Sequence, residues 1–180
     1  LLKENDINAL LKSHTSTEER LEDYDLLKEL IMKKDITSIL DLGCGLNPIA
    51  LANTSLTYYA VDINEEDISI VNAYFAKSHI PGKAFIYDLR KIDDSLPKVD
   101  LCIILKVFDV LEKKGHKLAE KIIRSVKSKY FLISFSTKTL SGKPMNHPQR
   151  GWIEWLLKRL SFSYETIKTK NEIYYFATKA

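Results

Sequence analysis

The segment Ile36–Ala50, ITSILDLGCGLNPIA, begins as an apolar run rich in β-branched residues and contains two closely spaced glycines. Its first half predicts a strand over residues 36–42. Gly43 and Gly45 then allow the backbone to turn tightly and a ligand to approach it closely. In an open α/β sheet, a turn at the carboxyl end of a strand is where ligands bind. This turn is therefore the first candidate for a functional site.

Strand and helix patterns alternate after this turn. Strand patterns cover residues 57–63, 84–89, 99–107 and 130–135, and helical patterns cover residues 64–78, 115–125 and 148–160. Two further alternating segments, residues 163–168 and 173–178, are joined by Lys170-Asn171 and predict a hairpin. This order predicts an α/β fold with a doubly wound, mostly parallel sheet and a C-terminal antiparallel hairpin.

Length and composition fit one globular domain. The chain has 180 residues, of which 45% are hydrophobic and 28% charged, enough for a substantial α/β core. We expect a single domain over residues 1–180, with a helical N-terminal segment (1–34) and a cofactor-binding core (35–180). The absence of a long apolar run and of a signal-peptide pattern, together with only two cysteines, predicts a cytoplasmic protein without membrane contact.

Charge is mild in sum but uneven along the chain. The formal net charge is +3, yet between Lys113 and Arg159 the basic residues greatly outnumber the two acids, Glu120 and Glu154. Such a distribution fits a basic face for nucleic acid. Solvated lysines on helix surfaces are the commoner cause of the same pattern.

Two aspartates stand near the ends of the next predicted strands. Asp62 comes seventeen residues after Gly45, and Asp88 lies near the end of the third strand. A carboxylate at the end of the second strand can accept hydrogen bonds from the ribose hydroxyls of a nucleoside cofactor, and Asp88 can face the adenine. The alternative for both residues is that they only cap a turn or a helix.

Two cofactors compete for this arrangement. The dinucleotide fingerprint requires a third glycine three residues after the second, where this chain has Pro48. Asp41 also stands two residues before Gly43, and its carboxylate would repel a pyrophosphate. The same charge favours the ammonium and sulfonium groups of S-adenosylmethionine. The sequence therefore favours this methyl donor over NAD.

Five stretches of the sequence form a recognisable set: HTSTEER (14–20), DLGCGLNPIA (41–50), LKV (105–107), VLE (110–112) and SFSTKTLSGK (134–143). On these segments the chain resembles the aminoglycoside-resistance 16S ribosomal RNA methyltransferases, which modify N7 of a guanine in the decoding region of the 30S subunit. The resemblance runs from about residue 14 to residue 160, and its most specific parts are the His-x-Ser-Thr-x-Glu-Arg segment and the late Ser-Phe segment. The resemblance implies a Rossmann-like class I methyltransferase fold, S-adenosylmethionine as cofactor, and ribosomal RNA in the 30S subunit as partner.

The resemblance also implies roles for individual residues around the cofactor. Arg20 would hold the methionine carboxylate, as its planar fork allows, and Lys106 would lie near the methionine end. Asp62, with Ile63 beside it, would bind the ribose, whereas Asp88 and the backbone of Leu89 would recognise adenine. Alternatively, Arg20 is an exposed helix partner of Ser16 or Tyr24, and Lys106 is a snorkelling lysine at a strand end.

The chain also departs from the family pattern. Only about 30 residues precede the first strand, where family members carry a longer helical extension that helps them grip the 30S subunit. Ser136 replaces the usual proline, and Ser141 replaces the first glycine of the late segment. We therefore keep open a different RNA or small-molecule substrate, a non-catalytic cofactor-binding module, and a partner that supplies RNA contacts.

No catalytic residue is assigned, because guanine N7 has an in-plane lone pair and no proton to remove. The candidate substrate-binding residues are the basic side chains Lys138, Lys143, Arg150 and Lys158, with Arg159 beside them. Trp152 and Trp155 are possible stacking platforms, although their spacing more often indicates packing onto a sheet. Cys44 reads as a packing residue. The four histidines show no metal-ligand spacing, so no metal is expected.

Overall fold

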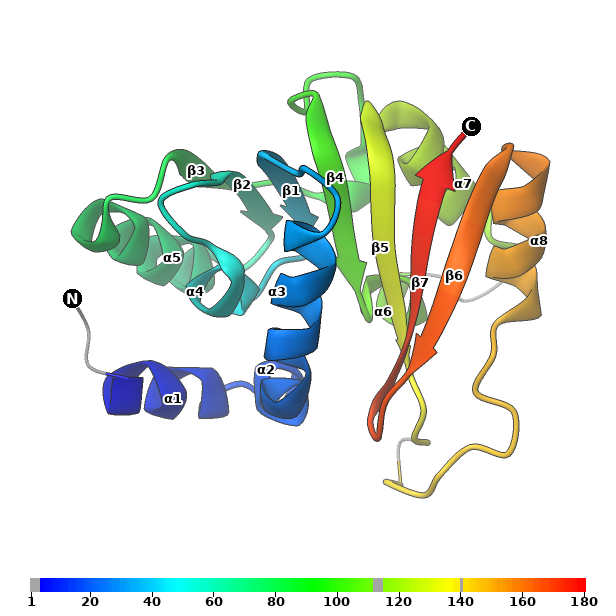
Figure 1. Ribbon diagram of the computed structural model, residues 1–180, viewed down its shortest axis with the longest axis horizontal. Coiled ribbons are helices and arrows are strands. Elements are labelled where there is room, and N and C mark those ends of the chain that lie inside the picture. Colours follow the sequence, from blue (N-terminus) through cyan, green and yellow to red (C-terminus); the bar gives the residue numbers. More distant parts are fainter. Residues whose placement is uncertain (1–3, 112–114, 140) are drawn as a thin grey trace. The chain divides into compact units, whose positions relative to one another are not determined.

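The computed structural model describes residues 4–111, 115–139 and 141–180 (Figure 1). The chain comprises two compact units, Leu1–Asp88 and Leu89–Ala180. Glu112 and Leu140, which belong to two of the family-like segments, lie outside the described residues. Within the described part of the chain, no helix is both long and apolar enough to cross a membrane.

The first unit is built on three parallel strands in the order β3-β2-β1. They are β1 (Ser38–Leu42), β2 (Thr57–Asp62) and β3 (Gly82–Ile86). The helix α5 (Glu65–Ser78) packs against β2 and β3, and the short helix α4 (Asn47–Leu51) follows β1. Before β1 come α1 (Glu4–Lys12), α2 (Thr15–Glu19), the 3-10 turn η1 (Leu21–Asp23) and α3 (Tyr24–Met32).

The start of α5 is well determined by local chemistry. The Asn64 side chain accepts hydrogen bonds from the backbone N–H groups of Glu66 (3.0 Å) and Asp67 (3.4 Å), as expected of a helix cap. Three acids fill the first turn, where they interact favourably with the helix dipole. This cap fixes the turn that directly follows Asp62.

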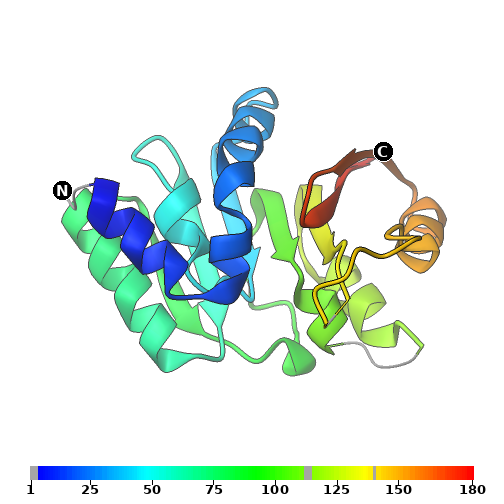
Figure 2. The same ribbon diagram turned by 90° about the horizontal axis from the view of Figure 1, so that it is seen from below.

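The second unit contains parallel strands followed by the predicted hairpin, in the order β4-β5-β7-β6 (Figures 1 and 2). Its strands are β4 (Val99–Leu105), β5 (Ser128–Ser136), β6 (Phe162–Lys168) and β7 (Glu172–Lys179). Its helices are the 3-10 turn η2 (Leu89–Lys91), α6 (Val107–Leu111), α7 (Lys117–Ser125) and α8 (Gly151–Arg159). Parallel strands with helices between them and an antiparallel C-terminal hairpin confirm the predicted α/β class.

Several element boundaries differ from the sequence prediction. The fourth strand ends at Leu105 rather than at residue 107, because Lys106 adopts a left-handed conformation and α6 begins at Val107. The third strand is shifted to residues 82–86, so Leu89 belongs to η2 and not to a strand. The helix predicted over residues 148–160 begins only at Gly151. Local patterns place elements well but place their ends poorly.

Candidate functional site

The glycine turn after β1 is fastened to the neighbouring strand. The backbone N–H groups of Gly43 and Cys44 both donate to the carbonyl oxygen of Val61, at 2.8 and 3.0 Å. Gly43 and Gly45 have φ angles of 65° and 47°, which favour glycine. At Gly45, no heavy atom beyond its chain neighbours lies within 4 Å of the position that a Cβ would occupy. The turn therefore presents open backbone that a ligand can approach.

Asp62 ends β2 and completes this turn. Its Oδ2 atom accepts a hydrogen bond from the Gly45 N–H at 2.9 Å, and its Oδ1 atom accepts one from the Asn64 N–H at 3.0 Å. The side chain is half-buried, so the carboxylate is fixed in place yet reaches the surface. Each carboxylate oxygen has a second lone pair, which suits hydroxyl donors such as those of a ribose.

Two exposed isoleucines lie beside Asp62. Ile63 is 64% exposed, and Ile86, which pairs with Asp62 in the register of β2 and β3, is 55% exposed. Exposed apolar side chains next to a fixed carboxylate suit a ligand with a polar sugar and a flat apolar ring. Ile63 is among the predicted cofactor-binding residues, whereas Ile86 is not, because the sequence placed it inside the third strand (84–89) and the structure places it at the end of that strand.

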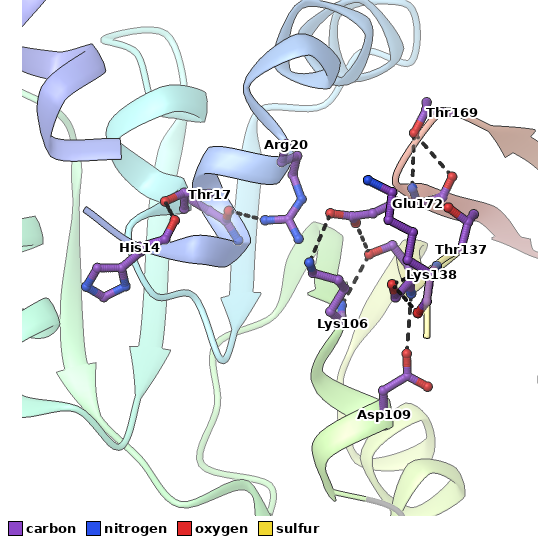
Figure 3. Close-up of polar contacts among 12 residues, drawn as sticks. His14, Thr17, Arg20, Lys106, Asp109, Thr137, Lys138, Thr169 and Glu172 are labelled. Carbon is purple, nitrogen blue, oxygen red and sulfur yellow. Dashed lines mark hydrogen bonds and ion pairs between the residues drawn. The ribbon is translucent and has the colours of Figure 1, made fainter. Parts of the chain in front are cut away.

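Asp41 and Arg20 belong to a buried polar network beneath the turn. Arg20 is only 1% exposed, and its Nη1 atom donates to the Asn47 Oδ1 atom at 2.6 Å (Figure 3). The Tyr24 hydroxyl donates to the same oxygen at 2.9 Å, and the Tyr58 hydroxyl donates to Asp41 at 2.9 Å. The alternative interpretation of Arg20 as an exposed helix residue is therefore wrong.

The environment of Asp41 shifts its ionisation strongly. Burial raises the pKa of the Asp41 carboxyl to about 7, although the Tyr58 hydroxyl and the Arg20 guanidinium oppose this shift. Asp62 contributes a smaller effect in the same direction as burial. The negative charge that the sequence suggested for this position is thus present only above about pH 7.

His14 makes a local contact in the same unit. Its Nε2 atom lies 3.2 Å from the Asp67 Oδ1 atom on α5. Burial raises the pKa of the Asp67 carboxyl, and His14 acts against this shift. Thr17, in the same family-like segment, donates its hydroxyl to the Leu11 carbonyl at 2.5 Å and so connects α2 to α1.

Asp88 and Leu89 follow the third strand. Asp88 is half-buried, and the preceding residue, Tyr87, donates its N–H to the carbonyl of Asp62 at 2.9 Å. The segment before Asp88 is thereby tied to the end of β2. The Leu89 side chain is buried, so only its backbone is suited to the role implied by the resemblance.

Lys106 is the first residue after β4 and has a defined set of partners. Its backbone N–H donates to the carbonyl oxygen (3.1 Å) and the Oγ atom (3.2 Å) of Ser134 on β5. Its Nζ atom lies 4.0 Å from the Oε1 atom of Glu172, and its side chain is 17% exposed. The ammonium of Lys106 therefore has a buried carboxylate beside it, and part of the side chain still reaches the surface. Sequence reasoning missed Glu172, whose only signal was an acid at the start of an apolar strand.

The candidate RNA-binding side chains differ in how exposed they are and in the contacts they already make. Lys143 and Lys158 are exposed and Lys138 is half-buried. Arg150, in contrast, donates to the carbonyls of Pro148 (2.6 Å) and Ser136 (3.2 Å) and pairs with Asp109 at 3.6 Å. These contacts anchor the segment before α8, so a phosphate would have to compete with them.

The two tryptophans of α8 have different surroundings. Trp152 stacks on His116 at a centroid distance of 3.9 Å and meets the edges of Phe108 and Phe135, which is packing rather than a free platform. Trp155 is 61% exposed, and the Arg159 guanidinium lies 4.4 Å from its ring centroid. Trp155 is therefore the one of these two that can meet a base.

Cys44 is buried beside the glycine turn, and burial raises the pKa of its thiol well above the ordinary value. A protonated, enclosed thiol is a poor nucleophile.

We expect Cys44→Ala to keep the affinity for S-adenosylmethionine within about threefold of the unchanged protein, since only a small packing group is lost. Titration calorimetry measures this affinity, and slow alkylation of Cys44 in the folded protein checks its enclosure. A loss of binding larger than tenfold would contradict the packing role.

Among the described residues, no group of three or more metal-ligating side chains is found.

The sequence matches a known family and several named proteins. Residues 3–176 match the family described as ribosomal RNA methyltransferase (FmrO). The 16S rRNA (guanine(1405)-N(7))-methyltransferase of Serratia marcescens is 28% identical over 159 residues, covering 85% of this chain and 62% of that protein. The enzyme of the same name from Proteus mirabilis is 26% identical over 180 residues, covering 94% and 64%. The chain thus spans slightly less than two thirds of the length of these curated relatives.

Solved structures share the fold. The 16S rRNA methylase ArmA superimposes with a TM-score of 0.76 at 27% identity, covering 97% of this chain and 91% of that one. The 16S rRNA methyltransferase RmtF, solved with S-adenosyl-L-homocysteine, gives a TM-score of 0.83 at 25% identity, with coverages of 99% and 70%. These likenesses confirm the predicted Rossmann-like methyltransferase fold. With the family match over nearly its whole length, the chain belongs to the FmrO family of ribosomal RNA methyltransferases.

Proposed function

We propose that this chain is an S-adenosylmethionine-dependent methyltransferase that modifies guanine N7 in the decoding region of 16S ribosomal RNA. The observation that carries the proposal is the Asp62 carboxylate, held against Gly45 at an open glycine turn, in a chain of this family. We propose that residues 1–180 form one methyltransferase domain and act in the cytoplasm, where 30S subunits are found.

Several groups along the chain fit the nucleoside part of the cofactor. We assign Asp62 to the ribose hydroxyls, the exposed faces of Ile63 and Ile86 to the adenine ring, and Asp88 with the Leu89 backbone to the adenine edge. Gly45 leaves room for the ligand beside the backbone, and Gly43 supplies the positive φ angle that the turn requires. Arg20 and Lys106 are assigned to the methionine end, and Asp41 supplies a negative charge when it is ionised.

The bound cofactor supplies an electrophilic methyl group on a cationic sulfur. Methylation at guanine N7 breaks one carbon–sulfur bond and forms one carbon–nitrogen bond, and the positive charge moves from sulfur to the base. N7 uses an in-plane lone pair, so no proton leaves that atom and no general base is required. The protein's contribution is therefore to hold the two reactants in line.

The choice of ribosomal RNA rests on the family and on the exposed basic groups of the second unit. Lys143 and Lys158 are exposed and suited to phosphates, and Lys138 is half-buried. Trp155 is suited to stacking on a base. The named relatives act on guanine 1405 of 16S rRNA, but they are longer than this chain. A partner that supplies further RNA contacts is compatible with that difference.

The decisive experiment is transfer of a radiolabelled methyl group to isolated 30S subunits, with free 16S RNA and total tRNA in parallel. We expect a signal that depends on 30S subunits and maps to one guanine by chemical cleavage at N7-methylguanine. A signal on tRNA alone would replace the substrate. No transfer to any RNA, with cofactor affinity intact, would overturn the ribosomal assignment and favour a small-molecule substrate or a non-catalytic module.

A further inference from the structure

Glu172 is a carboxylate sealed inside the second unit at the first position of β7. It is 0% exposed, while the four residues that follow it in the strand are also buried and are all apolar or aromatic. Its Oε2 atom accepts a short hydrogen bond of 2.6 Å from the Ser134 hydroxyl on β5 (Figure 3). Its Oε1 atom lies 4.0 Å from the ammonium of Lys106. One buried acid thus connects β7 to β5 and to the residue that follows β4.

The backbone around Glu172 is held by hydrogen bonds within the hairpin. Thr169 donates its N–H to the Glu172 carbonyl at 2.9 Å, and the Glu172 N–H donates to the Thr169 Oγ1 atom at 3.2 Å. In the register of the antiparallel pair, Glu172 lies opposite Ser136 on β5. These contacts close the hairpin end and fix the backbone position from which the Glu172 side chain extends.

Lys106, the partner of Glu172, has an unusual backbone. Its φ angle is 58°, a left-handed conformation that L side chains rarely adopt. The hydrogen bonds from its N–H to Ser134 hold it there. Non-glycine residues keep such a conformation only where the surroundings enforce it, and these positions concentrate at functional sites. Lys106 also stands at the carboxyl end of a parallel strand, the edge where α/β folds act on ligands.

Stability alone does not account for this pair. A buried ion pair commonly contributes no more stability than apolar side chains of the same volume, because both charges lose their water. An apolar residue at position 172 would match the rest of the buried strand. The acid is therefore better explained by its effect on Lys106, whose ammonium lies close enough to the surface to reach a ligand.

We propose that Glu172 is a positioning residue for methyl transfer, which holds the ammonium of Lys106 and the turn after β4 in their working arrangement through Ser134. The inference rests on the proposed function. The carboxylate itself is fully buried, so it acts through Lys106 and not by direct contact with a ligand. Its contribution passes through Lys106, so loss of either residue removes the same interaction.

The test is a double-mutant cycle with Glu172→Gln, Lys106→Met and the variant carrying both. Glutamine keeps the shape and the hydrogen bond with Ser134 but removes the charge. We expect Glu172→Gln to lower kcat for 30S methylation about tenfold or more, with KM for 30S subunits changed less than about threefold. The loss in the double variant should match that of Lys106→Met alone, because coupled residues are not additive. Glu165→Gln, an exposed acid on β6, is the matched control.

A second measurement needs no RNA substrate. Amine-reactive labelling with mass spectrometry should modify Lys106 several-fold faster in Glu172→Gln than in the unchanged protein, while exposed Lys168 labels equally in both. If the unchanged protein methylates no RNA, the proposed function fails, yet this labelling still decides whether Glu172 holds Lys106. Unaltered labelling of Lys106, or independent kinetic losses that multiply in the double variant, would overturn the inference.

Discussion

Replacing Asp62 with alanine is expected to raise the Kd for S-adenosylmethionine about a hundredfold or more. Each hydrogen bond from a ribose hydroxyl to a carboxylate contributes about 1.5 to 3 kcal/mol, and in the proposed cofactor site Asp62 accepts two of them. The same change removes the acceptor for the Gly45 N–H, so the glycine turn also loses the contact that fixes it. Ligand contact and the ordering of the turn are therefore lost together.

Titration calorimetry with S-adenosylmethionine and S-adenosylhomocysteine measures this effect. The fold must be checked at the same time, because the Asn64 N–H at the start of α5 also loses its bond to Asp62. Circular dichroism and the Tm should show a folded protein at the titration temperature. Asp93→Ala is a matched control, since Asp93 likewise accepts bonds in a local turn, from the N–H and hydroxyl of Ser95. An Asp62→Ala protein that binds within threefold of the unchanged one would refute the cofactor site.

The glycine turn and Asp62 could be predicted because their relationship is set by neighbouring strands. β1 and β2 are consecutive and parallel, so the segments after their last residues must lie together. Period-two and continuous apolar patterns located both strands, and the position of Asp62 at a strand end followed directly. The same reasoning missed Ile86, because the predicted strand, residues 84–89, placed it inside the strand, whereas it is the last residue of β3 and is exposed.

The buried partners of the site were not predictable in the same way. Arg20 lies on a short helical segment where exposure is the ordinary expectation for arginine, and its partner Asn47 is 27 residues away. Glu172 and Ser134 are 38 residues apart. Such pairs depend on how strands and helices pack, and no local period records them. Trp155 is the opposite case to Arg20. Its three-residue spacing from Trp152 suggested packing onto the sheet, but its side chain is exposed.

The affinity for S-adenosylmethionine is expected to rise with pH up to about pH 7 and then to level off. Burial raises the pKa of Asp41 to about 7, so the carboxyl is mostly neutral below that pH. The sulfonium of the ligand is always cationic and favours the ionised carboxylate, so binding must first remove a proton at low pH. The resulting Kd rises by up to about tenfold for each pH unit below 7.

Folding stability should respond to pH in the opposite sense. The unfolded chain releases the Asp41 proton near the ordinary pKa of 3.8, whereas the folded protein keeps it up to about pH 7. Between these values the folded state binds more protons, so this group's contribution to the free energy of unfolding falls as pH rises. The ionised Asp41 carboxylate that improves ligand binding near neutral pH thus makes the unliganded fold less stable. A buried charge of this kind costs folding stability and is compensated only when the cationic ligand is bound.

Two variants isolate Asp41 from other titrating groups. Asp41→Asn should give a Kd that is weaker at pH 7.5 but nearly independent of pH, because the asparagine can still accept from the Tyr58 hydroxyl and carries no charge. Arg20→Gln removes the guanidinium that lowers the Asp41 pKa, so the rise in affinity should move to higher pH. Calorimetry at pH 5.5, 6.5 and 7.5 tests both, with Asp41→Asn as the baseline for titration of the ligand's own amine.

Parallel pH profiles in Asp41→Asn and the unchanged protein would show that the charge of Asp41 plays no part in holding the ligand. An Arg20→Gln profile that is not displaced would separate the two residues and leave Arg20 with contact to the ligand as its role.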